Sequence, residues 1–412
     1  MTQTLPVSVV IVSRGRAEAL MRCLIGVSQL QYDPFEVVVV ADPAGVAAVE
    51  ASGFADQVKV VPFDAANISA ARNLGVAQAA GEVVAFIDDD AVPEPTWLRY
   101  LCAPALREDV AAMGGVVRGR NGISFQWRGQ GIDARGEGYP LDLKSTQAVV
   151  LHPPQGRAIK TEGTNMAFRR SVLVALGGFD PAYRYFLDET DLNIRLARAG
   201  HATALVPMAE VHHGFAANAH RSAARVPSDL FEIGASWAVL HRKHVTEAMQ
   251  ADHWKALRVE QRQRLLRHMV AGTLEPRDVR RLMKRLDAGH ADGMTRETDT
   301  GALPRHPASP FQEFKIPLRR SMLMTTRPWH FARDHATAAA RVKNGEIVTL
   351  LSLSLTGMYH HVRFGSDGVW VQRGGLFGRS DRDQPLWRFE TRNRRIKAER
   401  ARIARQRGLS DL

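Results

Sequence analysis

The stretch Val83-Val84-Ala85-Phe86-Ile87-Asp88-Asp89-Asp90 places three acidic residues directly after a short apolar run. The run is too short for a helix, is rich in β-branched and aromatic residues and follows Gly81, which predicts a buried parallel strand. Side chains at the carboxyl end of such a strand face the crevice in which open α/β sheets bind ligands. Three adjacent carboxylates repel one another unless a cation or a solvated turn compensates their charge. The stretch therefore predicts either a site for Mg2+ or Mn2+, or a solvated turn that leads into Pro93.

The segments around this stretch alternate between strand and helix patterns. Apolar runs predict strands over 7–12, 35–40 and 58–61, and helical spacing of apolar residues predicts helices over about 17–30 and 68–80. Strands that alternate with helices form right-handed βαβ units around a parallel sheet. We therefore expect an α/β fold with a mixed, mostly parallel sheet flanked by helices.

The chain divides into four parts by composition. The α/β pattern extends over residues 1–230, and a basic helical region follows over 231–290. Residues 291–312 are rich in glycine, aspartate, threonine and proline, as in a linker. Residues 313–412 predict a small C-terminal α+β unit with a basic tail. Within the first part, the glycine-rich segment 118–145 predicts a loop or a small subsidiary sheet, and its Trp127 is a candidate platform for an acceptor.

A strand, a hairpin and a helix are expected in the C-terminal unit. The alternation over 351–355 predicts a half-buried strand, and 361–372 predicts a hairpin that turns over Gly365-Ser366-Asp367-Gly368. The tail over 391–407 carries eight basic residues opposed only by Glu399. Its helix has two interpretations, contact with an anionic lipid surface or an ordinary solvated face.

The bulk properties narrow the class of protein. The chain has 412 residues, a net charge of +12 and only two cysteines, which excludes a disulfide framework and fits a reducing cytoplasm. No signal peptide and no apolar segment of membrane-spanning length is visible, so we expect a cytoplasmic protein, with peripheral association at the inner face of the cell membrane as an option. The basic surplus suits an anionic membrane surface or a polyanionic substrate. Nucleic acid is not expected as a partner, because no zinc-finger spacing or RNA-binding aromatic motif accompanies the charge.

Polar groups in the first half fall where strand ends converge. Ser13-Arg14-Gly15-Arg16 follows the first strand, Asp42 follows the second, and Arg72-Asn73 precedes the strand that ends in the aspartates. A nucleotide needs an acceptor for its base, polar partners for its ribose and cations for its diphosphate, and this set supplies each of them. The alternatives are a surface pair on a helix for Arg72-Asn73, and a turn before Pro43 for Asp42.

Several motifs in order resemble the family 2 glycosyltransferases with the GT-A (Rossmann-like) fold over about residues 6–245. The resemblance rests on Val-Ser-Val-Val-Ile-Val-Ser-Arg-Gly-Arg (7–16), Val-Val-Val-Val-Ala-Asp (37–42), Ala-Arg-Asn-Leu-Gly-Val-Ala-Gln-Ala-Ala-Gly-Glu (71–82), Ala-Phe-Ile-Asp-Asp-Asp (85–90), Pro-Glu-Pro-Thr-Trp-Leu (93–98), Gly-Thr-Asn-Met-Ala-Phe-Arg-Arg (163–170), Gly-Gly-Phe-Asp (177–180), Asp-Glu-Thr-Asp-Leu-Asn-Ile-Arg-Leu (188–196) and Val-His-His (211–213). Each motif is weakly specific, whereas their order and spacing together are specific.

The resemblance implies a metal and donor site. Asp88 and Asp90 are similar to the outer residues of the family's metal motif, which holds Mn2+ or Mg2+ against the donor diphosphate. His213 is similar to a histidine that completes this site in some relatives, with His212 as the alternative. The resemblance further implies that Asp42 contacts the nucleotide base, although Ala41 stands where many relatives carry another acid. The other donor-binding residues that it implies are Ser13, Arg14, Arg72, Asn73 and Asp89.

The resemblance also implies a catalytic base at the start of a later helix. Family members use a Glu-Asp pair there, and this chain has the reversed order Asp188-Glu189. Position favours Glu189 and residue type favours Asp188, so the sequence leaves both open. Helix capping by these acids is the structural alternative, and it is the expected role of Asp191.

These features predict an inverting, metal-dependent glycosyltransferase. It would move a hexosyl or deoxyhexosyl group from a nucleotide-diphosphate sugar to a hydroxyl of a glycan or lipid-linked acceptor, in polysaccharide biosynthesis. A nucleotidyltransferase is one alternative, although no glycine-rich phosphate loop follows the first strand. A catalytically degenerate binding subunit is another, and the reversed Asp188-Glu189 pair is the feature that supports it.

Overall fold

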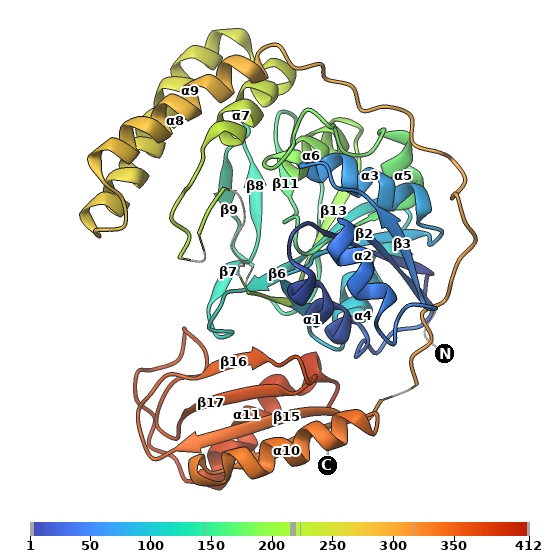
Figure 1. Cartoon of the computed structure of the whole chain (residues 1–412), viewed down its shortest axis with the longest axis vertical. Coiled ribbons are helices and arrows are strands. Elements are labelled where there is room, and N and C mark those ends of the chain that lie inside the picture. The colour runs from blue at the N-terminus through green and yellow to red at the C-terminus, as the bar shows by residue number, and fades with distance from the viewer. Residues whose placement is uncertain (1–3, 144, 215–219, 223, 318, 410–412) are drawn as a thin grey trace.

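The computed structural model describes residues 4–143, 145–214, 220–222, 224–317 and 319–409. Its N-terminal part is built on a mixed ten-stranded sheet whose main order is β10-β13-β6-β12-β4-β1-β2-β3 (Figure 1). One half of this sheet is parallel and contains β1 (Val7–Ser13), β2 (Phe35–Ala41), β3 (Val58–Pro62) and β4 (Val83–Asp88). The expected α/β fold with a mixed sheet is confirmed.

The other half of the sheet joins parallel and antiparallel strands. β12 (Met166–Arg169) is antiparallel to both β4 and β6 (Val110–Arg118), and the long β13 (Ala202–His213) runs parallel to β6. Three short strands pair at its margins, namely β5 (Ala91–Pro93), β7 (Phe125–Trp127) and β10 (Val149–Leu151). The segment after β6 also forms the predicted subsidiary sheet, from β8 (Gln130–Ile132), β9 (Gly138–Pro140) and β11 (Ala158–Lys160).

Helices cover both faces of the main sheet because its strands are apolar on both faces. In β1, Val7, Val9 and Ile11 belong to one core, and Val10 belongs to the other. The first core is covered by α1 (Ala17–Val27), α2 (Pro43–Glu50), α4 (Trp97–Leu101) and the 3-10 turn η1 (Ala103–Leu106). The second is covered by α3 (Ile68–Gln78), α5 (Arg170–Ala175) and α6 (Asp188–Arg198). Burial of the strands on both sides follows the rule for parallel sheets.

The basic region folds as three helices, α7 (Phe231–His244), α8 (Glu247–Val270) and α9 (Pro276–Gly293). Glycines let α7 and α9 approach closely, since a Cβ on Gly234 would lie 2.1 Å from the Leu286 carbonyl oxygen and one on Gly289 would lie 1.9 Å from that of Phe231. The segment after α9 runs back along the α/β domain (Figure 1). The amide of Ala308 donates to Ala77, and Phe314 packs against Phe35, so this linker is docked on the domain.

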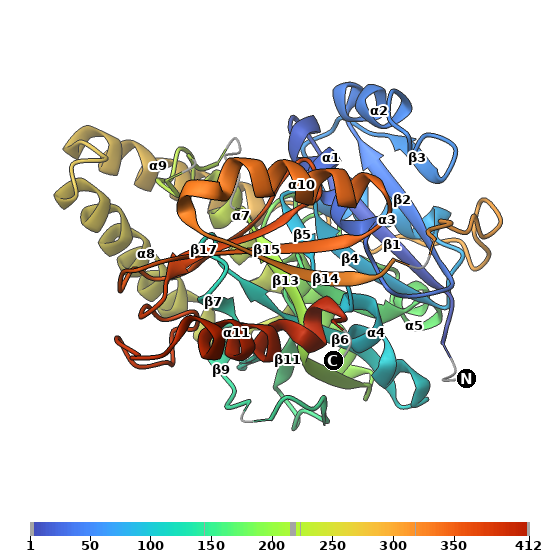
Figure 2. The same ribbon diagram turned by 90° about the horizontal axis from the view of Figure 1, so that it is seen from below.

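The C-terminal unit is a second, four-stranded sheet in the order β14-β15-β17-β16, with a helix on each face (Figure 2). Its elements are β14 (Ser321–Thr326), η2 (Pro328–His330), α10 (Phe331–Lys343), β15 (Ile347–Ser354), β16 (His361–Phe364), β17 (Trp370–Gly375) and α11 (Arg392–Arg407). The hairpin predicted over 361–372 is confirmed as β16 and β17. The strand predicted over 351–355 is confirmed as the end of β15, but its predicted half-burial is wrong, because α10 and α11 bury β15 from both sides.

The basic tail is part of this unit's core and of its contact with the α/β domain. In α11, Arg395 and Arg407 are buried, and the Arg407 guanidinium forms an ion pair with Glu94 and stacks on Trp370 at 3.8 Å. The indole of Trp370 in turn donates to the Gln29 Oε1 at 3.2 Å. Neither sequence interpretation of the tail is correct for these buried arginines, because they pair inside the protein. Within the described residues, no helix is long and apolar enough to cross a bilayer.

We predict that Arg407→Gln destabilises the protein strongly. The substitution leaves the Glu94 carboxylate buried without its guanidinium, and removal of one partner from a buried ion pair costs about 3–5 kcal/mol. Arg405→Gln, an exposed position on the same helix, is the matched control. Thermal unfolding should show a melting temperature several degrees lower for Arg407→Gln alone. Equal melting temperatures for the two variants would contradict the role of this ion pair.

The same ion pair predicts a pH dependence. Burial by itself would raise the pKa of Glu94, but Arg407 and His212 bring it well below its ordinary value of 4.5. A carboxyl group with a lowered folded-state pKa stabilises the fold above that ordinary value, and the contribution is lost as the pH falls below it. The stability difference between wild type and Arg407→Gln should therefore be constant near neutrality and shrink below pH 4.5. Denaturant titrations over a pH series measure this difference.

Candidate metal and donor site

Two carboxylates and an imidazole meet at the carboxyl end of β4. One ligand atom each from Asp88, Asp90 and His213 lies within 4.8 Å of the others. β13 brings the histidine there, because His213 is paired with Ala91, the residue that follows Asp90. Its Nε2 lies 3.1 Å from the Asp90 Oδ1, and its Nδ1 lies 2.9 Å from the Gln126 Oε1. Oxygen and imidazole ligands suit Mn2+, and a partner on the second ring nitrogen fixes the ring for ligation.

The middle aspartate points away from this cluster. The Asp89 carboxylate accepts a hydrogen bond from the Ser13 hydroxyl at 2.7 Å and pairs with Arg16 at 2.6 Å. Arg16 also lies 3.5 Å from Asp90. Asp89 is fully buried and thereby ties the loop after β1 to the loop after β4. Asp89 therefore faces away from the cluster and holds the two loops together.

A pocket of about 590 Å³ opens beside the cluster, at the carboxyl ends of β1, β2 and β3. Three predicted residues line it, namely Ser13, Arg14 and Asp42. The Asp42 carboxylate caps α2 through the Gly45 amide and accepts a second hydrogen bond from the Gly15 amide at 3.0 Å. The pocket is also lined by residues that the sequence analysis missed, among them Phe63, Asp64, Asn67, Arg184 and Tyr185.

The neighbours Arg72 and Asn73 have different roles. Arg72 is buried, forms a short ion pair with Asp188, lies 3.6 Å from Asp88 and donates to the Gly163 carbonyl at 3.2 Å. The Asn73 side chain instead pairs with the backbone of Phe179, at 2.7 and 2.9 Å. Adjacent residues on a helix point about 100° apart, so only Arg72 reaches the site. Asn73 holds the α5–α6 connection in place.

Both candidate bases are at the start of α6, near the metal cluster. Asp188 is locked to Arg72, with only 3% of its side chain exposed, whereas the Glu189 side chain is 12% exposed and lies 3.5 Å from the Lys160 amine. Burial raises the pKa of Asp188 to about 7 against the opposing charge of Arg72. Burial alone would also raise the pKa of Glu189, but Lys160 and Arg72 lower it. Glu189 is therefore the more accessible and the more firmly ionised of the two.

The turn before this pair is conformationally unusual. Leu187 adopts a left-handed backbone conformation with φ of 66°, which is uncommon for a residue other than glycine. Such positions concentrate at functional sites, where the surrounding structure holds them. In the first turn of α6, the Asp191 carboxylate pairs with Arg195 at 2.8 Å and with Lys243 at 2.6 Å. Asp191 thus anchors α6 to α7 and takes no part in the site.

The structure also decides between the roles that the sequence allowed for two tryptophans and two histidines. Trp97 is buried, and its indole donates to the Asn165 Oδ1 at 2.7 Å, so this side chain packs in the interior. The prediction of Trp127 as an acceptor platform is wrong, because its side chain belongs to the main core. Of the two histidines, His213 faces the metal cluster, whereas His212 lies 2.7 Å from the Glu94 carboxylate.

Comparison with known proteins identifies the family. The family pattern described as "Glycosyltransferase like family 2" matches residues 5–227, more than half of the chain. The pre-mycofactocin glycosyltransferase of Mycobacterium tuberculosis is 28% identical over 215 residues, covering 50% of this chain and 42% of that protein. The probable glycosyltransferase YdaM of Bacillus subtilis is 27% identical over 227 residues, covering 49% of each chain. The matches thus span less than half of the length of these relatives.

A solved structure, that of GalNAc-T7 with UDP, GalNAc and Mn2+, aligns with 52% of this chain and 44% of its own at 19% identity, with a TM-score of 0.43. That likeness is distant. The family match, in contrast, spans the cluster of Asp88, Asp90 and His213, the pocket beside it and the pair Asp188-Glu189. The chain therefore belongs to the glycosyltransferase-like family 2.

Proposed function

We propose that this chain is an inverting, metal-dependent glycosyltransferase. It transfers a hexosyl or deoxyhexosyl group from a nucleotide-diphosphate sugar to a hydroxyl group of a glycan or lipid-linked acceptor. The observation that supports this proposal most strongly is the cluster of Asp88, Asp90 and His213 beside a pocket of about 590 Å³, whose lining residue Arg16 lies 3.5 Å from Asp90. The relatives that match this part of the chain carry glycosyltransferase names.

The donor would occupy the pocket at the ends of β1, β2 and β3. Asp42 and Asp64 offer carboxylate acceptors for base and ribose groups, and Arg14, which pairs with Asp64 at 3.0 Å, adds a cation. Asp88, Asp90 and His213 would hold Mn2+ or Mg2+. When bound, this ion supplies positive charge to the departing nucleoside diphosphate. Arg16, a quarter of whose side chain is exposed, adds positive charge at the same edge.

The inverting reaction needs one carboxylate to take the proton of the acceptor hydroxyl as its oxygen attacks the sugar. We assign this role to Glu189, because its side chain is accessible and ionised. Asp188 is buried under Arg72 and acts as a positioning residue that holds this guanidinium beside Asp88. This assignment of the base to Glu189 agrees with the position of the base in the family motif, whereas residue type would favour Asp188.

The acceptor side of the proposal rests on the subsidiary sheet. Lys160 and Glu162 of the β11 segment face Glu189, with the Lys160 amine 3.5 Å from Glu189 and 3.8 Å from Glu162. Charged donors and acceptors of this kind suit a hydroxyl-rich acceptor such as a glycan. We place the enzyme in polysaccharide or glycoconjugate biosynthesis, in the cytoplasm and at the inner face of the membrane.

Turnover with a panel of nucleotide-sugar donors tests the proposal directly. The purified protein should release nucleoside diphosphate from at least one donor, and a chelator should stop the release because the leaving group loses its counter-charge. Release of pyrophosphate from a sugar phosphate and a nucleoside triphosphate would instead identify a nucleotidyltransferase. Donor binding without any turnover would identify a binding subunit.

The metal cluster is tested by thermal stability, independently of turnover. Mn2+ should raise the melting temperature of the wild type, because a ligand that binds only the folded state stabilises it. Asp90→Asn should abolish this increase. Asp252→Asn, an exposed acid on α8, should keep it in full. An unchanged Mn2+ effect in Asp90→Asn would contradict the assignment of the ligands.

Substitutions of Asp188 and Glu189 should affect different kinetic parameters. Loss of a general base lowers the rate about 10²–10⁴-fold, so Glu189→Gln should lose kcat by such a factor with little change in the donor KM. Asp188→Asn releases Arg72 from its partner and should raise the donor KM. If Asp188→Asn lowers kcat alone and Glu189→Gln stays active, the roles of the two residues are reversed.

A further inference from the structure

The exposed aromatic side chains of the described residues gather on one edge of the C-terminal sheet. β14, β15 and β17 are parallel, so the segments that follow them leave the sheet at the same edge. These segments carry exposed large apolar residues, which we call the aromatic edge: Trp329, Leu355, Met358, Tyr359, Leu386, Trp387 and Phe389. Leu355 and Phe389 are the most open of them, at 77% and 86% exposed. Contiguous exposed apolar side chains of this kind mark an interaction site.

Contacts between loops hold this edge together. The Trp387 ring lies against Gly357, whose added Cβ would meet it at 2.4 Å, and the Phe389 ring lies 5.9 Å from that of Phe377. The Phe377 amide donates to the Thr356 carbonyl at 3.1 Å. The loops after β15 and β17 therefore present their apolar side chains on a shared, ordered base.

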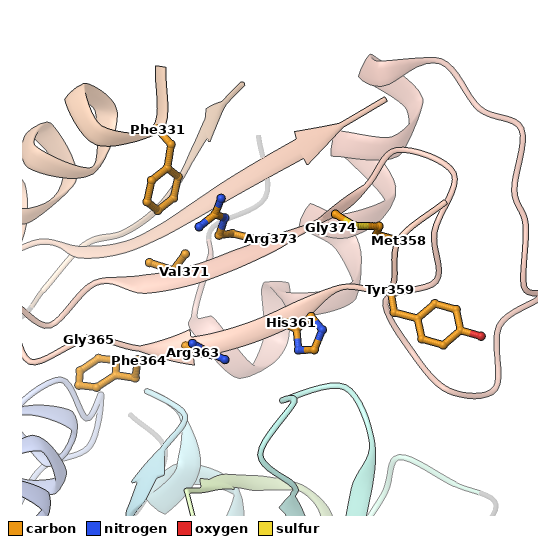
Figure 3. Close-up of a pocket in the computed structure, with 10 residues that line it drawn as sticks. All are labelled: Phe331, Met358, Tyr359, His361, Arg363, Phe364, Gly365, Val371, Arg373 and Gly374. Atoms are coloured by element: carbon orange, nitrogen blue, oxygen red, sulfur yellow. The ribbon is translucent and has the colours of Figure 1, made fainter. Parts of the chain in front are cut away.

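A groove of about 790 Å³ adjoins the aromatic edge on the face of β16 and β17 that α10 leaves open (Figure 3). Phe331, Met358 and Val371 give it an apolar floor and rim, and Arg363 and Arg373 project into it from the two strands. The Arg373 guanidinium lies 4.5 Å from the Phe331 ring centroid. Among the described residues neither arginine has a carboxylate partner, and the groove lining contains no acidic or amide side chain. The groove thus suits an anionic group attached to an apolar body.

The C-terminal unit carries a large excess of basic residues. Residues 313–412 contain 20 lysines and arginines against nine aspartates and glutamates, so +11 of the chain's net charge of +12 lies there. Two of the arginines at the aromatic edge lie over its rings, Arg327 at 5.3 Å from Trp329 and Arg379 at 4.3 Å from Tyr359. Tryptophan and tyrosine beside basic residues are typical of the interfacial layer of a bilayer. Basic residues add attraction to anionic lipids.

We propose that the C-terminal unit is a docking module for an anionic membrane surface. The aromatic edge enters the interfacial layer, and the groove takes the head group of an acidic phospholipid on Arg363 and Arg373, with its chain along Phe331 and Val371. This inference does not rest on the proposed transferase activity. It also relocates the membrane contact, which the sequence alone assigned to the helix over 391–407, to the opposite face of the same sheet.

Other occupants fit less well. A neutral glycan would leave the charges of Arg363 and Arg373 uncompensated, and in the groove lining only Tyr359 and His361 have side chains that can accept a hydrogen bond from a hydroxyl group. Leu355, Met358 and Leu386 add aliphatic surface between the aromatic rings, and this surface suits acyl chains better than sugar rings. A second copy of the chain would bring its own Arg363 and Arg373 to the same surface, and like charges across an interface are unfavourable.

Vesicle co-sedimentation of the full chain tests the proposal. The protein should bind vesicles of phosphatidylcholine with phosphatidylglycerol, bind vesicles of phosphatidylcholine alone far more weakly, and be released by salt. At about 1 kcal/mol for each basic residue, Arg363→Gln with Arg373→Gln should weaken binding about thirtyfold. Leu355→Ser with Phe389→Ser should weaken it about tenfold or more. Donor turnover in solution should be unchanged in both double variants, because these residues lie outside the α/β domain.

Matched pairs on the helical region serve as controls. Val259→Ser with Val270→Ser removes two exposed apolar groups from another surface, and Arg280→Gln with Lys284→Gln removes two exposed charges. Both double variants should bind as the wild type does. If the Leu355/Phe389 variant binds normally while soluble inorganic polyphosphate displaces the wild type, the surface recognises a polyanion and the lipid proposal is overturned. Sedimentation velocity that shows a dimer lost in the Leu355/Phe389 variant would overturn it in favour of self-association.

Discussion

The buried guanidinium of Arg72 is the interaction on which the site depends. It lies between Asp188 of α6 and Asp88 of β4, elements that are 100 residues apart in sequence, and it also donates to the Gly163 carbonyl. Without this cation, three carboxylates, those of Asp88, Asp188 and Glu189, would face one another in a region shielded from water, where their repulsion is strong. Arg72 therefore lets the acidic group at the end of β4 and the acidic pair at the start of α6 lie next to each other. Lys160 has the corresponding role on the far side of Glu189.

The C-terminal unit is joined to the rear of the same site. Arg407 of α11 pairs with Glu94, Glu94 contacts His212, and His212 is adjacent in β13 to His213 of the metal cluster. Arg118 of β6 forms a second bridge, since it pairs with Glu210 at 2.9 Å and with Asp381 of the C-terminal unit at 3.3 Å. Both bridges reach the end of β13 that carries His213. The strand that carries His213 is thus braced by the unit that we propose to dock on the membrane.

The sequence predicted those parts of the site that follow from local rules. Asp42 and Asp88 follow parallel strands, and the pocket does lie at these strand ends. Asp64 likewise follows a parallel strand, β3, and lines the pocket, but β3 is short and its end is only weakly marked in the sequence. Lys160 and Gln126 had no such signal, since they come from segments without clear periodicity that only the tertiary fold brings to the site. Likewise, the periodicity of Arg72-Asn73 could not say which of the two faces the donor.

The tail helix shows why charge patterns alone mislead about partners. Arg392 to Arg407 read as one continuous basic surface, but the partner of Arg407 is Glu94, 313 residues earlier, and Arg402 pairs with Glu399 at 2.9 Å. An arginine that is paired and buried contributes little to attraction at a distance. Arg363 and Arg373 lie on neighbouring strands with few charges near them in sequence, and they project into an open groove. The basic residues most able to meet an anion are therefore the isolated ones, because the fold has used part of the dense run to hold its two sheets together.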